Sequence, residues 1–277
     1  MVARAVRANR QSRHGGQAAV ISAPTSQTPA LEFATATDRG RVRPHNEDSL
    51  LADPAHGFAL LADGVGGYNA GEVASHMAVT VIAEGLRAAW RERQAPTGAA
   101  PDIASLLQHE IDATNAAIHH AGLSHPAYAG MATTLVAAVF HGDRVTVGHV
   151  GDSRLYRLRG GSLQALTRDH SVVQEQVERG MLSPQAARLS PQAHLITRAL
   201  GSEAAVEAEL HEHPVLPGDL YLLCSDGLFN AVEEDAIKDV LDSHGADIQK
   251  AAQDLVRMAN DNGGWDNVSV VVVRVRG

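Results

Sequence analysis

The feature that most constrains the fold is an aspartate placed where an apolar run of the chain stops or starts. The run FALLA ends at Asp63 and is followed by GVGG, and the run LYLLCS ends at Asp226, again followed by glycine. Asp152 directly follows the run TVGHVG, and Asp266 lies just before the run VSVVVV. Burying a charged carboxylate is unfavourable unless an opposite charge meets it. If these runs are strands of one sandwich, their acids can converge at one edge, and such convergence indicates a bound cation.

Nine segments carry the alternating or continuously apolar pattern of strands. Glycine-containing pairs at 142–143 and 160–161 are typical of hairpin turns, so the middle of the chain is predicted to form an antiparallel meander. The predicted strands are 31–37, 57–62, 134–141, 144–150, 154–158, 162–166, 207–211, 220–225 and 268–275.

Three further segments carry an apolar stripe at helical spacing, namely 74–89, 103–118 and 248–259. Helices therefore separate groups of strands rather than alternate with single strands, which favours an α+β layered domain over a parallel sheet. The polar segment 168–203 contains two prolines. We expect it to be an insertion lying over the sheet edge, with a short helix around 172–179.

The composition restricts the partners and the compartment. Without the four arginines of residues 1–30, the chain has 19 basic and 32 acidic residues, a net charge of −13, which argues against nucleic acid as the main partner. No apolar run approaches the roughly 18 residues that a membrane span needs, so we expect no membrane partner. Cys224 is the single cysteine, which excludes an internal disulfide and favours a reducing, cytoplasmic location. Residues 1–30 carry four arginines and no acid, and they are predicted to form a disordered basic tail.

The clustered acids suggest a metal site that handles phosphate. Neighbouring carboxylates repel one another, and hard divalent cations relieve that repulsion. A set of oxygen ligands alone selects Mg²⁺, Mn²⁺ or Ca²⁺ over Zn²⁺. Two such ions held by Asp63, Asp226 and Asp266 would leave one net positive charge, which attracts a phosphate. Arg43 could then bind that phosphate through two parallel N–H donors.

Other catalytic chemistries lack their motifs. A cysteine phosphatase needs an arginine six positions after its nucleophile, and the residue six positions after Cys224 is Asn230. The chain contains no GK[ST] phosphate loop, no HExxH and no GxSxG. His45, His149 and His170 lie near the acidic motifs, and each is interpreted as a hydrogen-bonded structural residue.

Seven motifs in this order resemble the bacterial branch of the protein phosphatase 2C family, the metal-dependent Ser/Thr protein phosphatases. They are RPHNED, ADGVGG, GMATT, HVGDSR, LTRDHS, LLCSDG and WDNVSVVVV, and the resemblance runs from about residue 31 to 277. It implies an antiparallel β-sandwich flanked on both sides by pairs of helices, with a binuclear metal cleft at one end. Residues 31–277 would form this phosphatase domain, and the segment near 168–203 would be its flap.

The same resemblance implies roles for matching residues around two Mn²⁺ or Mg²⁺ ions. Asp63 would bridge both ions, Gly64 would offer its carbonyl oxygen to one, and Asp226 and Asp266 would complete the other. Arg43 would bind the substrate phosphate. Glu47 and Asp48 would act through metal-bound waters or behind the direct ligands, and Asp152 would hold a weaker third ion.

Three departures from the family pattern accompany the match. Val65 stands where eukaryotic members carry a histidine proposed as the general acid, so the donor of the leaving-group proton is unassigned. Ala132 replaces a common glycine, and Trp265 replaces the usual proline before the final Asp-Asn. Neither Ala132 nor Trp265 is expected to touch a ligand directly, so we expect activity to survive both replacements.

The predicted function is hydrolysis of phosphoserine and phosphothreonine through a metal-bridging hydroxide, without a covalent phosphoenzyme. Phosphorylated proteins would be the substrates, a bacterial Ser/Thr kinase the opposing partner, and a monomer the active form. One alternative is a catalytically inactive module of the same fold that binds phosphoproteins. Another is a metal-dependent nuclease, which the acidic charge disfavours.

Overall fold

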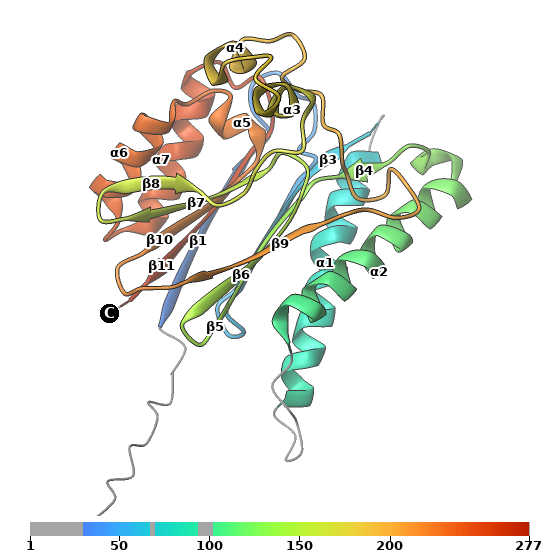
Figure 1. Ribbon diagram of the computed structural model, residues 1–277, viewed down its shortest axis with the longest axis horizontal. Helices are drawn as coiled ribbons and strands as arrows, with labels where there is room; N and C mark the ends of the chain where they lie inside the picture. The colour runs from blue at the N-terminus through green and yellow to red at the C-terminus, as the bar shows by residue number, and fades with distance from the viewer. Residues whose placement is uncertain (1–29, 67–69, 94–101, 277) are drawn as a thin grey trace, which may run out of the picture.

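The computed structural model describes residues 30–66, 70–93 and 102–276. The predicted basic tail therefore lies, except for Ala30, outside the described residues. Within these ranges two antiparallel sheets stack into a sandwich with helices on both outer faces (Figure 1). Among the described residues, no helix combines the length and the apolar character needed to cross a bilayer.

The first sheet has the strand order β1-β11-β10-β7-β8, and the second has the order β2-β3-β5-β6-β9 with β4 paired to β3. Every neighbouring pair is antiparallel. The bounds are β1 Leu31–Asp38, β2 Asp48–Asp53, β3 Phe58–Val65, β4 Ala132–Thr133, β5 Leu135–His141, β6 Arg144–Val150, β7 Arg154–Arg159, β8 Ser162–Ala165, β9 Glu209–Pro214, β10 Leu220–Cys224 and β11 Val268–Val275.

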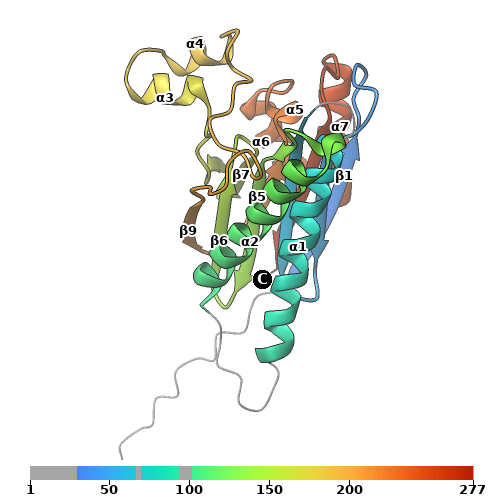
Figure 2. The ribbon, with the colours of Figure 1, turned by 90° about the vertical axis from the view of Figure 1, so that its right-hand side faces the viewer.

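Two helix pairs cover the outer faces, as Figures 1 and 2 show from two sides. The helices α1 (Ala70–Arg93) and α2 (Ile103–Ser124) pack on the second sheet, where they share a buried cluster with β3 and β5. The helices α6 (Glu234–His244) and α7 (Ile248–Asp261) pack on the first sheet. The predicted α+β sandwich flanked by helix pairs is thereby confirmed.

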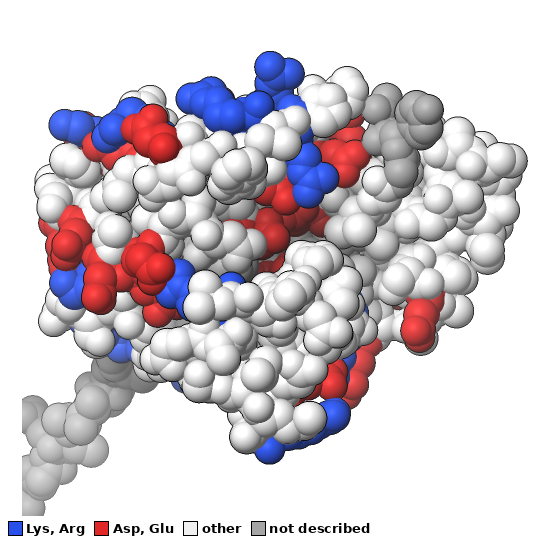
Figure 3. Space-filling view, turned by 90° about the horizontal axis from the view of Figure 1, so that it is seen from above, with Lys and Arg blue, Asp and Glu red and all other residues white. Residues whose placement is uncertain are grey.

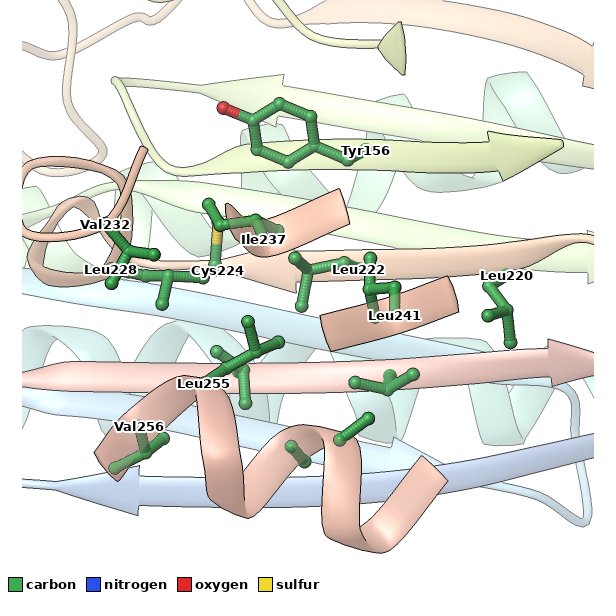
Figure 4. Close-up of a cluster of buried hydrophobic side chains, with 14 of the residues drawn as sticks. Tyr156, Leu220, Leu222, Cys224, Leu228, Val232, Ile237, Leu241, Leu255 and Val256 are labelled. Carbon is green, nitrogen blue, oxygen red and sulfur yellow. The ribbon is translucent and has the colours of Figure 1, made fainter. Parts of the chain in front are cut away.

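The alternation of side chains along the central strands explains the three-layered core. In β11, Val270 and Val272 face the helices, whereas Val271 and Val273 face the second sheet. Figure 4 shows the helix-facing layer, in which Leu255 of α7 lies opposite Leu222 and Cys224 of β10. Because successive residues of a strand point to opposite faces, a strand buried on both sides is apolar along nearly its whole length, as VSVVVV is except at Ser269.

Several elements were not expected from the sequence. The strands β2 and β4 were not predicted, because β2 is only half-buried and begins and ends in aspartate, and β4 has only two residues. The helix α6 was not predicted either, since its buried stripe consists of Ile237 and Leu241 alone. The meander prediction was wrong in one respect: β6 and β7 do not pair, because the intervening loop carries the chain from the second sheet to the first.

The segment between β8 and β9 extends beyond one end of the sandwich and contains the short helices α3 (Val172–Glu178) and α4 (Pro184–Arg188) (Figure 2). Ser171 and Ser183 directly precede these helices as N-caps, and the hydroxyl of each accepts the backbone N–H of the third residue of its helix. The short helix α5 (Asp226–Phe229), which follows β10, lies at the same end of the molecule.

Candidate metal centre

A cavity of about 360 Å³ opens at the end of the sandwich where α3, α4 and α5 lie. Seen from this end, acidic side chains gather inside a hollow with basic side chains at its border (Figure 3). The lining residues are Arg43, Pro44, His45, Glu47, Asp63, Gly64, Val65, Gly66, Thr134, Asp152, His194, Ile196, Asp226, Asp266 and Asn267.

The four aspartates reach this cavity from both sheets. Asp63 lies near the end of β3 in the second sheet, and Asp226 opens α5 directly after β10 of the first sheet. Asp266 lies just before β11 in the first sheet, and Asp152 lies in the loop that passes from one sheet to the other. Segments distant in sequence thus bring their acids to one end, as the strand-then-acid pattern predicted.

Gly64 permits the close packing of β3 against its neighbours beside the cavity. A Cβ at this position would overlap the carbonyl oxygen of Gly71 in α1 and would lie 2.6 Å from the carbonyl oxygen of Glu47. The N–H of Gly64 donates to that same Glu47 oxygen at 3.1 Å. A larger residue would therefore push the end of β3 away from both segments.

The electrostatics of the cavity are unfavourable for the acids alone. Burial raises the pKa of the Asp63 and Asp226 carboxyls well above the usual range, and repulsion by neighbouring acids, led by Asp48 and Asp152 respectively, raises each pKa further. Burial also raises the pKa of Asp152 to about 7 and that of Asp48 to about 6. These carboxyls bind protons more readily than usual because nothing within the described residues fully compensates their charge.

The residues present suit two hard divalent cations. The acidic side chains lining the cavity offer oxygen atoms, which Mg²⁺ and Mn²⁺ prefer. Among the described residues that line it, Arg43 is the one permanently charged cation facing five carboxylates. Asp48 lies behind the lining with its Oδ1 buried and unpartnered in the described part of the chain, while its Oδ2 accepts the Ser225 hydroxyl at 2.8 Å. An added positive charge would satisfy this surplus of oxygen donors.

Arg43 stands at the mouth of the cavity rather than inside it. Its Nη2 lies 2.7 Å from Oδ2 of Asp266, and the two side chains are 54% and 34% exposed. The bond to Asp266 raises the pKa of the Arg43 guanidinium, which stays charged. An exposed, permanently charged guanidinium beside a recessed acidic site is well placed to meet an incoming phosphate.

The structure places every sequence-predicted site residue at this end. Arg43, Glu47, Asp63, Gly64, Asp152, Asp226 and Asp266 line the cavity, whereas Asp48 lies one layer behind them. Cys224 is fully buried, and burial raises the pKa of its thiol to about 12, so it has no character of a nucleophile.

Sequence reasoning missed the polar residues that hold these acids. The hydroxyl of Thr134 accepts the backbone N–H of Asp63 at 2.9 Å. The Asn267 side chain accepts the N–H of Glu47 at 2.8 Å and donates to the carbonyl oxygens of Arg39 and His45. Both residues stand inside the motifs GMATT and WDN, and the signal that could have found them is a polar residue bordering a buried strand.

Comparisons with known proteins agree on one family. The family model described as protein phosphatase 2C matches residues 40–261. The Serine/threonine phosphatase stp of Listeria welshimeri is 39% identical over 240 residues, which cover 86% of this chain and 93% of that protein. The Serine/threonine protein phosphatase PstP of Mycobacterium tuberculosis is 39% identical over 248 residues, which cover 90% of this chain but only 46% of PstP.

Solved structures give the same relationship. A crystal structure of M. tuberculosis PstP/Ppp superposes with a TM-score of 0.81 at 38% identity, covering 89% of this chain and 99% of that one. The catalytic domain of PstP in complex with two manganese ions gives a TM-score of 0.78, also at 38% identity, with the same coverage of 89% and 99%.

Proposed function

Since the chain belongs to the protein phosphatase 2C family, we propose which of its residues bind the ions and the substrate of that family's reaction. The protein is a metal-dependent protein serine/threonine phosphatase, a phosphoric monoester hydrolase with a dinuclear Mn or Mg centre. Its substrates are phosphoproteins. The single observation that carries our assignment of residues is the set of buried and half-buried carboxylates from both sheets facing one cavity.

The acids of the cavity hold the two ions in this proposal. Asp63, which reaches the cavity from the second sheet, would hold both ions, and the carbonyl oxygen of Gly64 would contribute beside it. Asp226 and Asp266 would bind from the first sheet. When bound, the ions supply a water of lowered pKa and positive charge beside the phosphoryl group. Asp152 binds a weaker third ion, and Glu47 and Asp48 act from behind the direct ligands.

Arg43 receives the phosphate of the substrate. Its exposed guanidinium lies at the cavity mouth and carries two N–H groups on one edge, which match two phosphoryl oxygens. Asp266 orients this guanidinium at 2.7 Å. The side chain of Val65 has no ionisable group, so position 65 offers no acid for the leaving oxygen.

The segment that contains α3 and α4 serves in this proposal as the flap of residues 168–203, and residues 31–277 as one phosphatase domain. Support comes from Ile196 and His194, which belong to this segment and line the cavity beside the acids. A protein substrate that reaches Arg43 would therefore meet this segment.

The biological setting is part of the same proposal. We expect a cytoplasmic monomer that opposes a Ser/Thr kinase and has no nucleic acid or membrane partner. The chain's net charge of −9 supports the exclusion of nucleic acid. A catalytically inactive binding module is not favoured, because the relatives that match most of the chain are phosphatases.

The test of the residue assignment replaces one acid at a time in the full-length protein. Asp226→Asn and Asp266→Asn remove a charge partner of the ions, so hydrolysis of a phosphopeptide and of an aryl phosphate in Mn²⁺ should fall by several orders of magnitude. Asp242→Asn, an exposed acid on α6 that pairs with Lys238, is the matched control and should leave the rate unchanged. Near-normal turnover by Asp226→Asn and Asp266→Asn would contradict the assignment.

A further inference from the structure

Two buried histidines lie directly behind the loop that carries Asp152, and the proposed reaction uses neither of them. His149, on β6, is 1% exposed and His170 is 6% exposed, and their ring centroids lie 4.7 Å apart. Glu209 of β9 pairs across the sheet with His149 and lies beside both rings. A polar group buried this deeply is unfavourable unless it makes specific contacts. Among the described residues, both ring nitrogens of His170 have polar partners, whereas the ring nitrogens of His149 have no hydrogen-bond partner.

A metal ion is a poor explanation of this trio. Ligand atoms of His149, His170 and Glu209 lie within 4.8 Å of one another, a set that in principle suits Zn²⁺. However, Nδ1 of His170 accepts the N–H of Gly151 at 3.1 Å. In a neutral imidazole the proton is then on Nε2, which has no lone pair left for a metal. The guanidinium of Arg198 also lies 3.4 Å from that Nε2, where it would repel a cation.

His170 instead forms hydrogen bonds with the peptide groups on both sides of Gly151. The backbone N–H of His170 donates to the Gly151 carbonyl oxygen at 2.8 Å, while its ring accepts the Gly151 N–H. Gly151 has a φ of 101°, and a Cβ there would lie 2.6 Å from Cγ2 of Thr134. The glycine thus has a single tight position, and Asp152 follows it directly in the chain.

The contacts of Nε2, on the other side of the His170 ring, fix the orientation of the ring. Nε2 of His170 lies 3.3 Å from Oε1 of Glu209, which accepts a hydrogen bond from the Nε2–H group and so favours this tautomer. The carbonyl oxygen of His170 accepts the N–H of Thr197 at 2.7 Å, and Ser171 forms an isolated bridge with Ile196. Since both Ile196 and Asp152 line the cavity, His170 links the two walls that they form.

We propose that His170 is a positioning residue for Asp152: it holds the peptide groups on both sides of Gly151 so that the Asp152 carboxylate faces the cavity and can bind the weaker third Mn²⁺. The inference rests on the proposed function, because that function assigns Asp152 to this ion. It adds a role for a buried ring that never touches the substrate. The positioning depends on Nδ1 as a hydrogen-bond acceptor, so a substitution can test it separately from the packing of the ring.

The test compares two replacements of His170 in the full-length protein by calorimetric titration of the metal-free form with Mn²⁺. His170→Leu removes the acceptor, so the weakest binding event should weaken roughly 3- to 10-fold, the effect of losing one hydrogen bond. His170→Asn places an amide oxygen near the position of Nδ1 and should restore most of that affinity. Asp152→Asn gives the reference for loss of the weak event, and all variants should keep the two tighter events.

A second measurement does not depend on any variant folding. The ¹⁵N NMR spectrum of the metal-free wild type should show His170 neutral with its proton on Nε2 at pH 7.5. A proton on Nδ1 would overturn the proposal, as would an unchanged weak event in His170→Leu or a wild-type titration with only two ions. A different result would contradict the proposed function, namely a wild-type protein that lacks the two tight Mn²⁺-binding events or has no phosphatase activity.

Discussion

At the scale of single residues, the cavity is a collection of acids that are unfavourable until a cation arrives. Their raised pKa values measure that cost, because each protonates at a pH at which an exposed carboxyl is fully charged. Hydrogen bonds from Ser225 and Ser269 lower the pKa of Asp48, but they do not cancel the effect of burial. Binding of Mn²⁺ or Mg²⁺ and stability of the metal-free protein are therefore opposed in these side chains.

This opposition predicts a pH-dependent effect of Asp152→Asn on the metal-free protein. The pKa of Asp152 is raised to about 7 in the folded state, so between roughly pH 4 and pH 7 the folded state holds a proton that the unfolded state has lost. The free energy of unfolding thus falls as the pH rises through this window. Asparagine has no such proton, so the variant should be more stable than wild type at pH 8, by on the order of 2–4 kcal/mol.

Urea unfolding with a chelator present, at pH 5 and at pH 8, measures this difference. At pH 5 the folded wild-type protein still holds this proton, but the unfolded chain has mostly lost it, so the advantage of the variant should be roughly 1–2 kcal/mol, clearly smaller than at pH 8. Burial lowers the pKa of His149 and of His170, so these residues also make stability depend on pH. Both residues are present in both proteins, so comparing the two proteins at each pH removes this contribution. An equal difference in stability between Asp152→Asn and wild type at both pH values would contradict the prediction.

Arg43 gives the second prediction at this scale. Hydrogen bonds to charged groups contribute roughly 1.5–3 kcal/mol, so Arg43→Ala should lower kcat/KM for a phosphopeptide about 10- to 150-fold, mainly through KM. The kcat/KM of Arg43→Lys should lie between the values of the wild type and of Arg43→Ala, because lysine keeps the charge but not the paired donors. Steady-state kinetics in Mn²⁺ check this, with the exposed Arg91→Ala on α1 as control. A kcat/KM for Arg43→Ala equal to that of the control would show that the guanidinium does not bind the phosphate.

At the scale of elements, the site depends on how closely β3 approaches α1 and the segment before β2. Gly64→Ala should destabilise the protein by about 1–3 kcal/mol or more, because its Cβ would overlap backbone atoms that cannot rotate away. Thermal or urea unfolding of the metal-loaded protein measures the loss. Gly122→Ala on α2 is the control, since the nearest atom to its Cβ would be 3.3 Å away, and it should be neutral or stabilising. Equal stability of the two variants would show that the packing beside Gly64 is loose.

The elements also show what the sequence could and could not predict. Asp63, Asp226 and Asp266 could be assigned to one end because each stands at the border of a continuous apolar run, a local feature of the chain. The roles of Thr134, Ser225 and Asn267 could not, because each depends on a contact with a residue between 44 and 220 positions away. The strand β2 escaped prediction for the same reason: its pairing with β3, not its own composition, makes it a strand.

At the scale of the whole molecule, the proposed ions connect the two sheets. Asp63 belongs to the second sheet, whereas Asp226 and Asp266 flank strands of the first. Mn²⁺ at about 100 times its dissociation constant should therefore add roughly 2.7 kcal/mol of stability per site, and a chelator should lower the Tm. A thermal melt of the full-length protein with and without Mn²⁺ measures this shift. Asp226→Asn should reduce it, and an identical shift in that variant would place the ions elsewhere.

The loop from β6 to β7 has a consequence for the mechanics of the protein. Because this loop is one of the segments where the chain passes from one sheet to the other, Asp152 is anchored to both halves of the sandwich at once. A slight parting of the halves would shift this carboxylate relative to both, whereas Asp63 and Asp226 would each move with its own half. The occupancy of the weakest ion site would then report on the separation of the two sheets. This site would lose its ion first when the halves separate and bind it last when they close.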